Sequence, residues 1–358
     1  MSGRGPGTRS RFVWEEGVPP LEEGLSVHLG RKVRVAALEG GLLEAQSTHP
    51  IDRLRVTLTS GETVSVIFKR LVPRPRSKGG RREVLIYRRL LAGQRFGAPA
   101  LYGSVYDSGR DCYWLFLEDV GEESLGGGDR EHWLAAARKL AEVHAAYHGR
   151  EEELRAMACL QEHGPAYYHM LAGDARRHLR QAAGRRALAR FDRLMARFDA
   201  AVAFLVRQPR TLVHGDVFPD NFLFQSGPRV RLIDWEEAAV GLGAWDLARL
   251  LDGWGSDKPT FVAAYLAEFA RRSGGRKPPE RRPLDEQAFH RTFAHGKILN
   301  VLWHLGWDAE ACSDAAFVNG LLDELEGGWR VLWERMPLLS RSPTGAASSP
   351  TSGGNGRV

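Results

Sequence analysis

The chain has 358 residues, 43% of them hydrophobic and 26% charged, which is the composition of a soluble globular protein large enough for two lobes or domains. It contains no apolar run long enough to span a membrane and no secretory signal, so we expect a cytoplasmic protein without a membrane partner. The net charge is +6, but lysine and arginine are scattered along the chain, which argues against a nucleic-acid partner.

The first third of the chain has the pattern of a small antiparallel sheet with one helix. Residues 1–24 lack periodicity and are expected to form a flexible extension. Residues 25–119 are expected to form a small lobe. Three strand patterns (KVRVAAL, DRLRVTL and TVSVIFKRL) begin it, with a hairpin turn at residues 59–62 between the last two. A helical pattern (REVLIYRRLLAG) and two further strands that turn at residues 108–109 complete it.

The remainder of the chain is mostly helical. Long helical patterns cover residues 132–149, 167–206, 244–273, 285–305 and 314–336, with one short stretch of strands and loops at residues 211–238. We expect residues 120–338 to form a large lobe and the polar residues 339–358 to be disordered. The predicted fold class is therefore α+β and bilobal.

The sequence HGDVFPDN at residues 214–221 carries the clearest chemical signal. It places Asp216 and Asn221 at the spacing D-x-x-x-x-N, which is that of the protein-kinase catalytic loop, with Gly215 where kinases carry arginine. At this spacing Asp216 can point at an acceptor hydroxyl while Asn221 turns toward a metal ion. Asp234 ends an apolar strand 18 residues after Asp216, where a second Mg²⁺ ligand belongs.

The segments LVHGDVFPDNFLF and RLIDWEEAAVGLGAWDLARLL resemble the aminoglycoside phosphotransferase and choline kinase-like family, which shares the protein-kinase fold. The similarity extends over about residues 35–335. It implies that Asp216 is the catalytic base or orients the acceptor, and that Asn221 and Asp234 bind Mg²⁺. It also implies that His214 and Asp246 brace the catalytic loop.

The same resemblance assigns the nucleotide site to the small lobe. Lys69, at the end of a strand, is expected to hold the α- and β-phosphates, and Glu83, at the start of the next helix, to pair with it. Residues 115–120 are expected to form the hinge that binds the adenine, with Glu118 and Val120 among the contacts. The glycine-rich phosphate loop of protein kinases is missing, so Ser47 and Thr48 are the candidate phosphate donors.

Several other side chains have candidate roles. Three acids near the motif are candidates for binding a cationic or polyhydroxyl acceptor, and they are Asp220, Glu236 and Glu237. His144 lies on an apolar helical pattern and is expected to be a packed core residue. Four tryptophans at near-helical spacing are expected to build the core of the large lobe, and they are Trp303, Trp307, Trp329 and Trp333. The three widely spaced cysteines are expected to be buried free thiols.

These patterns predict an ATP- or GTP-dependent, Mg²⁺-assisted O-phosphotransferase. An aminoglycoside or another sugar-like molecule is the leading acceptor, and a serine or threonine of a peptide is the alternative. A catalytically inert kinase fold used only for binding is a third hypothesis, against which the intact Lys69, Asp216, Asn221 and Asp234 argue.

Overall fold

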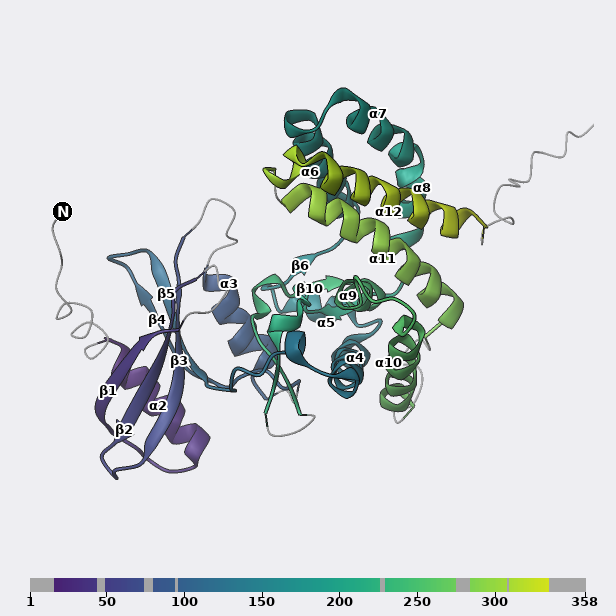
Figure 1. The fold of residues 1–358 in the computed structure, drawn as a ribbon. Helices are drawn as coiled ribbons and strands as arrows, with labels where there is room; N and C mark the ends of the chain where they lie inside the picture. Colours follow the sequence, from purple (N-terminus) through teal and green to yellow (C-terminus); the bar gives the residue numbers. More distant parts are fainter. Residues whose placement is uncertain are drawn as a thin grey trace, which may run out of the picture.

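The structure is a computed structural model that describes residues 16–43, 49–73, 80–93, 96–225, 229–274, 284–307 and 309–334. It has a small lobe built on an antiparallel sheet and a large, mostly helical lobe, joined after strand β5 (Figure 1). The predicted α+β, bilobal fold class is confirmed. The predicted tail at residues 339–358 lies outside the described residues, as do Ser47 and Thr48.

The small lobe contains a five-stranded antiparallel sheet with the strand order β1-β2-β3-β5-β4. Its strands and helices have the following bounds: α2 Val18–Leu29, β1 Val35–Leu42, β2 Ile51–Leu58, β3 Thr63–Leu71, α3 Gly80–Leu85, the π-helical turn η2 Ile86–Leu91, β4 Leu101–Asp107 and β5 Cys112–Glu118.

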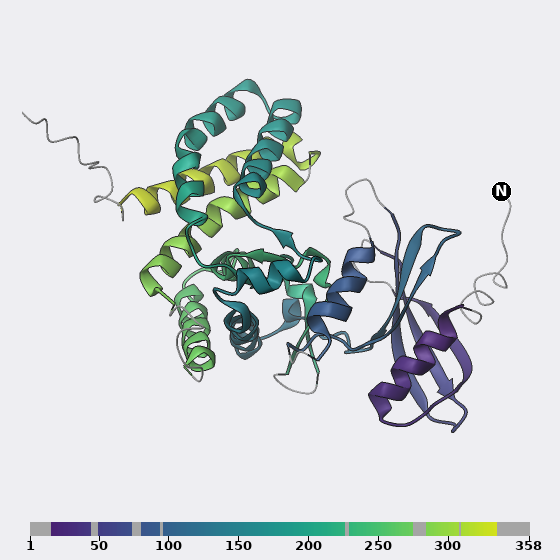
Figure 2. The same cartoon turned by 180° about the vertical axis from the view of Figure 1, so that it is seen from behind.

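Helices cover both faces of this sheet, and the two-residue repeat of strand β3 decides which side chain meets which helix. Val66 and Phe68 point into a core shared with α2, whereas Leu71 belongs to the core that includes α3. Lys69 has the same parity as Leu71, so it lies on the face toward α3 and the large lobe. Figure 2 shows α2 and α3 on opposite sides of the sheet.

The prediction of a flexible extension over residues 1–24 was wrong for the part that forms α2. Leu21 and Leu25, one helical turn apart, are completely buried against the sheet. A Cβ on Gly24 would lie 1.6 Å from the carbonyl oxygen of Tyr102, so only glycine lets α2 approach β4 this closely. The helix ends at Gly30, whose left-handed backbone (φ 65°) is a common helix C-terminus.

In the described residues, the large lobe contains nine α-helices and five short strands. Their bounds are as follows: α4 Arg130–Tyr147, α5 Glu151–Ala156, β6 Gln161–Glu162, α6 Pro165–Ala182, α7 Arg185–Leu194, α8 Phe198–Leu205, β7 Thr211–Val213, β8 Phe222–Phe224, β9 Val230–Leu232, β10 Ala239–Gly241, α9 Gly243–Leu250, α10 Lys258–Ser273, α11 Glu286–Trp307 and α12 Ala315–Glu334.

Two hydrophobic cores hold the large lobe. One is continuous with the small lobe, because Leu71 and Leu115 of the sheet belong to the same cluster as Leu140 of α4 and Trp235. The other joins α6, α8, α11 and α12. Cys112, Cys159 and Cys312 are buried thiols that form no disulfide bond, as predicted.

The predicted tryptophan core is only partly correct. Trp329 is buried in the second core, but Trp307 at the end of α11 is exposed, and Trp303 is only partly buried. The side chain of Trp333 lies outside the described part of the chain.

Candidate active site

Lys69 is the link between the two lobes. Its Nζ lies 3.0 Å from Oε1 of Glu83 at the start of α3 and 2.8 Å from Oδ1 of Asp234, which follows β9 of the large lobe. Burial alone would lower the pKa of Lys69, but the charges of Asp234 and Glu83 raise it above its ordinary value. The lysine is therefore charged, and Asp234 is its stronger counter-charge.

Glu83 is buried beside this lysine. Burial raises the pKa of Glu83 to about 7, against the opposing effect of the Lys69 charge. The structure thus brings together the lysine, the helix glutamate and the strand-end aspartate that sequence patterns place in three separate parts of the chain.

Asp216 and Asn221 close the catalytic loop on itself. The loop leaves β7 at Val213 and ends in the 3₁₀ turn η5, Pro219–Asn221. The side-chain amide of Asn221 donates to the backbone oxygen of Asp216 at 2.8 Å and to its Oδ2 at 2.9 Å. Because the amide nitrogen makes both bonds, the amide oxygen of Asn221 is the atom left for a metal ion.

The carboxylate of Asp246 on α9 binds the backbone of this loop. Its Oδ2 accepts from the backbone N–H of His214 at 2.7 Å, and its Oδ1 accepts from that of Gly215 at 3.3 Å. His144 Nε2 lies 3.3 Å from the same carboxylate. Burial alone would raise the pKa of Asp246, but hydrogen bonds and charge from the two histidines hold it below its ordinary value.

His214 connects the loop to Asp234. Its Nε2 donates to the backbone oxygen of Ile233 at 2.9 Å, so its Nδ1 is the atom that accepts from the N–H of Asp216 at 3.3 Å. Burial lowers the pKa of His214, which fits this neutral form. His144 is fully buried between Asp246 and the hydroxyl of Tyr265, so the prediction of a packed core histidine is confirmed.

Arg249 is a residue of this site that sequence reasoning missed. It extends from α9, donates to the backbone oxygen of Gly215 at 2.9 Å and lies 3.6 Å from Oδ1 of Asp216. Burial raises the pKa of Asp216 above its ordinary value, although Arg249 and His214 act in the opposite direction. The carboxylate of Asp216 is thus held by the guanidinium of Arg249 and the amide of Asn221.

Arg82, on α3 beside Glu83, was also missed. Its guanidinium donates to the backbone oxygen of Cys159 at 3.0 Å and to the backbone oxygens of Glu236 and Ala238. One side chain of the small lobe therefore fixes the backbone that follows Asp234 in the large lobe.

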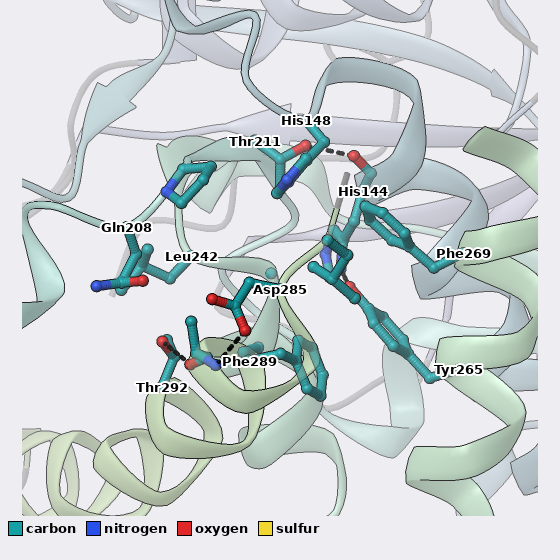
Figure 3. A pocket seen from close by; sticks show the side chains of 15 residues that line it. His144, His148, Gln208, Thr211, Leu242, Tyr265, Phe269, Asp285, Phe289 and Thr292 are labelled. Atoms are coloured by element: carbon teal, nitrogen blue, oxygen red, sulfur yellow. Dashed lines mark hydrogen bonds between the residues drawn. The ribbon is translucent and has the colours of Figure 1, made fainter. Parts of the chain in front are cut away.

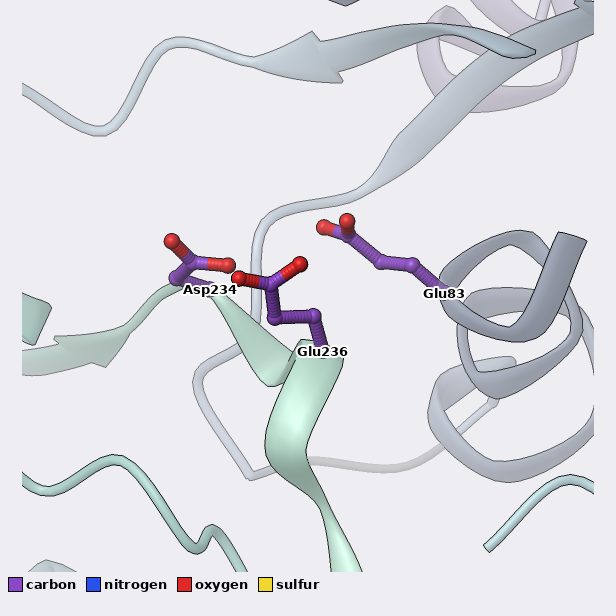
Figure 4. A group of neighbouring side chains, drawn as sticks. All are labelled: Glu83, Asp234 and Glu236. Carbon is purple, nitrogen blue, oxygen red and sulfur yellow. The ribbon is translucent and has the colours of Figure 1, made fainter. Parts of the chain in front are cut away.

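The predicted acceptor-binding acids do not gather in one place. Glu236 lies with Glu83 and Asp234 in a group whose carboxylate oxygens are within 4.8 Å of one another, and Figure 4 shows the three pointing toward a common centre. Glu237 accepts from the side chain of Gln161 at 3.2 Å. Asp220 accepts from Ser124 at 3.1 Å, on the hinge side of the loop.

At the hinge, Glu118 makes structural contacts with its side chain. It accepts from Arg231 at 2.6 and 2.9 Å and from the N–H of Ala100 at 3.0 Å. Val120 is buried. A role of either residue in binding the nucleotide therefore depends on the backbone and stays a prediction.

A separate cavity of about 240 Å³ lies behind the catalytic loop. Figure 3 shows its lining, in which Tyr265, Phe269 and Phe289 face His144, His148 and Thr211. It does not include Asp216 or Lys69, so the cavity is distinct from the candidate active site.

Comparison with known proteins identifies the family. A model described as the phosphotransferase enzyme family matches residues 52–284, which is more than half of the chain and includes Lys69, Asp216, Asn221 and Asp234. The chain belongs to the phosphotransferase enzyme family. The resemblance stated from the sequence is confirmed at the level of the family.

Solved structures agree on the fold. The GDP complex of an aminoglycoside 2′-phosphotransferase-IIIa mutant has a TM-score of 0.55 and 15% identity, covering 87% of this chain and 97% of the other. A choline kinase from Cryptosporidium parvum has a TM-score of 0.56 and 12% identity, covering 83% and 90%. At these identities the likeness shows the fold alone.

Curated relatives match only in part. A homoserine kinase from Gluconobacter oxydans is 42% identical over 60 residues, covering 16% of this chain and 19% of the relative. Another from Chelativorans sp. is 36% identical over 132 residues, covering 34% and 38%. The chain thus matches less than two fifths of the length of either.

In the described residues, no helix is long and apolar enough to cross a membrane.

Proposed function

We propose that this protein transfers the γ-phosphoryl group of ATP or GTP, bound together with Mg²⁺, to a hydroxyl group of a small molecule. Asp216 orients that hydroxyl and accepts its proton, Lys69 holds the phosphates, and Asp234 and Asn221 bind the metal ion. Phosphoryl transfer depends mainly on positioning and charge stabilisation, which is what these residue types supply.

One observation carries the proposal. Lys69 and Asp234, 165 residues apart in the chain and on different lobes, are in direct contact at 2.8 Å. The buried Lys69 contacts two carboxylates, those of Glu83 and Asp234. Such a group is not explained by folding stability alone, because a buried ion pair costs about as much in desolvation as it returns. The arrangement fits a site that holds phosphates and a cation.

The donor atoms fit Mg²⁺. This cation prefers oxygen ligands from one or two carboxylates together with the phosphates of the substrate. Asp234 and Asn221 offer such oxygens, and Glu83 and Glu236 lie within reach of Asp234. When bound, Mg²⁺ would neutralise negative charge on the nucleotide, while Lys69 would bind its phosphates.

Three classes of acceptor are candidates. A sugar-like molecule is the leading candidate from the sequence, and aminoglycosides are among the acceptors of structurally similar enzymes. Homoserine is a second candidate because the curated relatives that match are homoserine kinases, but they match over short segments only. A peptide hydroxyl is the third.

The test is turnover by the purified full chain. We expect nucleotide consumption to require Mg²⁺ and an added hydroxylated acceptor, and to stop when EDTA is added. Asp216→Asn should lower kcat by at least about 10²-fold, because a positioned base contributes about that much, while the nucleotide still binds in titration calorimetry. Turnover that survives this substitution would disprove the assignment of Asp216.

A further inference from the structure

Three aromatic side chains form a ledge beside the catalytic carboxylate. Phe218 lies two residues after Asp216, and its ring centroid is 5.6 Å from that of Trp303 on α11. Trp303 in turn stacks on Trp307, one helical turn further, with centroids 5.1 Å apart and planes inclined by 18°. We refer to Phe218, Trp303 and Trp307 as the aromatic ledge.

The outer parts of the aromatic ledge are open to solvent. Phe218 is 38% exposed and Trp307 is 61% exposed, although the helical spacing of the tryptophans predicts a buried position. Large aromatic side chains gain free energy by leaving water, so two exposed rings that both contact Trp303 mark a surface that a ligand covers. Here that surface adjoins Asp216.

Arg249 occupies the inner side of the aromatic ledge. Its guanidinium carbon lies 4.0 Å from the ring centroid of Trp303 and 4.9 Å from that of Phe218. The same guanidinium lies 3.6 Å from Asp216, so it ties the ledge directly to the catalytic loop. An aromatic surface attracts a cation through its ring faces, but this one already holds the cation of its own chain.

The predicted acceptor-binding acids make their contacts elsewhere in the site. Glu237 accepts from Gln161, Asp220 accepts from Ser124, and Glu236 lies in the carboxylate group around Asp234. The charge in contact with the ring faces of Trp303 and Phe218 is the positive charge of Arg249, which repels a cation brought to the same ring faces.

We infer that the acceptor is a hydroxylated molecule without a positive charge that carries an apolar ring, and that this ring packs on Phe218 and Trp307 while a hydroxyl meets Asp216. The inference rests on the proposed function, because it names the substrate class for the same site. It disfavours polycationic aminoglycosides, and it disfavours homoserine, which has no ring to place on the ledge.

The experiment uses acceptors that differ in one property at a time. Methyl and phenyl β-D-glucopyranoside present the same hydroxyl groups, but only the second has an apolar ring. N-acetylglucosamine and glucosamine present the same hydroxyl groups, but only the second carries a positive charge. Glucose, homoserine and kanamycin complete the panel. We expect phenyl glucoside to have a KM at least about tenfold below that of methyl glucoside, because aromatic contacts and burial of the ring supply about that much binding free energy. We also expect glucosamine to be a poorer acceptor than N-acetylglucosamine.

A variant pair tests the ledge itself. Trp307→Ala should raise the KM for phenyl glucoside about tenfold with a smaller change in kcat, and it should leave the KM for methyl glucoside within about twofold. Tyr106→Ala is the matched control, because Tyr106 is also an exposed aromatic residue but lies on β4 of the small lobe. Equal effects of Trp307→Ala on both glucosides would overturn the inference, as would a preference for kanamycin or homoserine.

Binding separates a failure of the ledge from a failure of the proposed function. Quenching of tryptophan fluorescence by the two glucosides is measured in Asp216→Asn with a non-hydrolysable ATP analogue. Selective binding of phenyl glucoside without turnover in the wild type would support the ledge and overturn the proposed function. Turnover of other acceptors without any preference for a ring would support the proposed function and overturn the inference about the ledge. If neither selective binding nor turnover is observed, the inference and the proposed function are both overturned.

Discussion

At the scale of single residues, Gly215 shows why the catalytic loop is held differently from that of protein kinases. Its backbone has a φ of +79°, and a Cβ at this position would lie 2.3 Å from the backbone oxygen of Glu237. Arginine therefore does not fit where kinases have it. Asp246 and Arg249 hold the loop instead, through the N–H and the carbonyl of this glycine.

Asp234 is the residue that we propose as the main metal ligand. It follows a strand, carries a left-handed backbone (φ 59°) that is rare for a residue with a side chain, and contacts Lys69. We expect Asp234→Ala to abolish the Mg²⁺-dependent binding of a non-hydrolysable ATP analogue more severely than Asn221→Ala, because a carboxylate offers the cation a full charge and an amide only a dipole.

Titration calorimetry with and without Mg²⁺ measures this difference. Asp199→Ala is a suitable control, since Asp199 lies exposed on α8 away from the site. Unchanged metal dependence in Asp234→Ala would contradict the assignment.

The lowered pKa of Asp246 predicts that its contribution to the free energy of unfolding depends on pH. Its pKa is lower in the folded protein than the ordinary value near 4, so its stabilising effect is complete above about pH 4 and is lost as the pH falls through the folded pKa. Asp246→Ala leaves the N–H groups of His214 and Gly215 without their acceptor, which should lower the free energy of unfolding by about 3 kcal/mol at pH 7.

Urea denaturation at pH 7, 5 and 3 measures the difference between the wild type and Asp246→Ala, which should be similar at pH 7 and 5 and smaller at pH 3. Asp246→Asn, which keeps one acceptor oxygen, should lose less and vary less with pH. A difference that stays constant or grows between pH 5 and pH 3 would refute this account.

At the scale of elements, α2 is part of the small lobe and not an appendage. Leu25 on this helix is completely buried, whereas Val27, two residues further, is 80% exposed. We expect Leu25→Ala to lower the free energy of unfolding by about 2–5 kcal/mol, which is the usual cost of such a cavity, and Val27→Ala to change it by less than about 0.5 kcal/mol. Chemical denaturation compares the two, and similar losses would mean that α2 does not pack as described.

The sequence of residues 18–30 contains a helix signal that corresponds to α2. Pro19 and Pro20 lie in the first turn, Leu21 and Leu25 have helical spacing, and Gly30 ends the helix. By contrast, Asp216, Asn221 and Asp234 were predictable because their spacing along the chain is itself the motif.

Arg82 and Arg249 were not predictable from local pattern. Arg82 follows Arg81 on α3, and Arg249 lies near the end of α9. Nothing in the nearby sequence distinguishes a guanidinium that bonds a distant carbonyl from one that faces water. Arg81 is exposed, whereas its neighbour Arg82 bonds to the backbone of residues 159, 236 and 238. Only the fold brings those carbonyls to α3. Trp307 is the reverse case, since its helical spacing predicted burial and its place at the end of α11 exposes it.

At the scale of the whole molecule, the two lobes are joined by contacts that need no added charge. Lys69 pairs with Asp234, Arg82 binds the backbone after Asp234, and Arg231 of β9 pairs with Glu118 of β5. The segment from Asp234 to Asp246 is short and ordered, with a 3₁₀ turn at Trp235–Glu237 and the strand β10 before α9. It leaves no room for a long activation loop.

These contacts predict an enzyme that is competent as purified. In many protein kinases the arginine of the catalytic loop pairs with a phosphorylated residue, so activity depends on an added charge of about −2. Gly215 has no side chain for such a pair, and Arg82 instead fixes the segment after Asp234 through backbone oxygens. We therefore expect treatment of the purified protein with a broad-specificity phosphatase to leave turnover within about twofold of that of a mock-treated sample. A large loss of turnover that rephosphorylation restores would show that an added phosphate, and not Arg82, holds this segment in its active form.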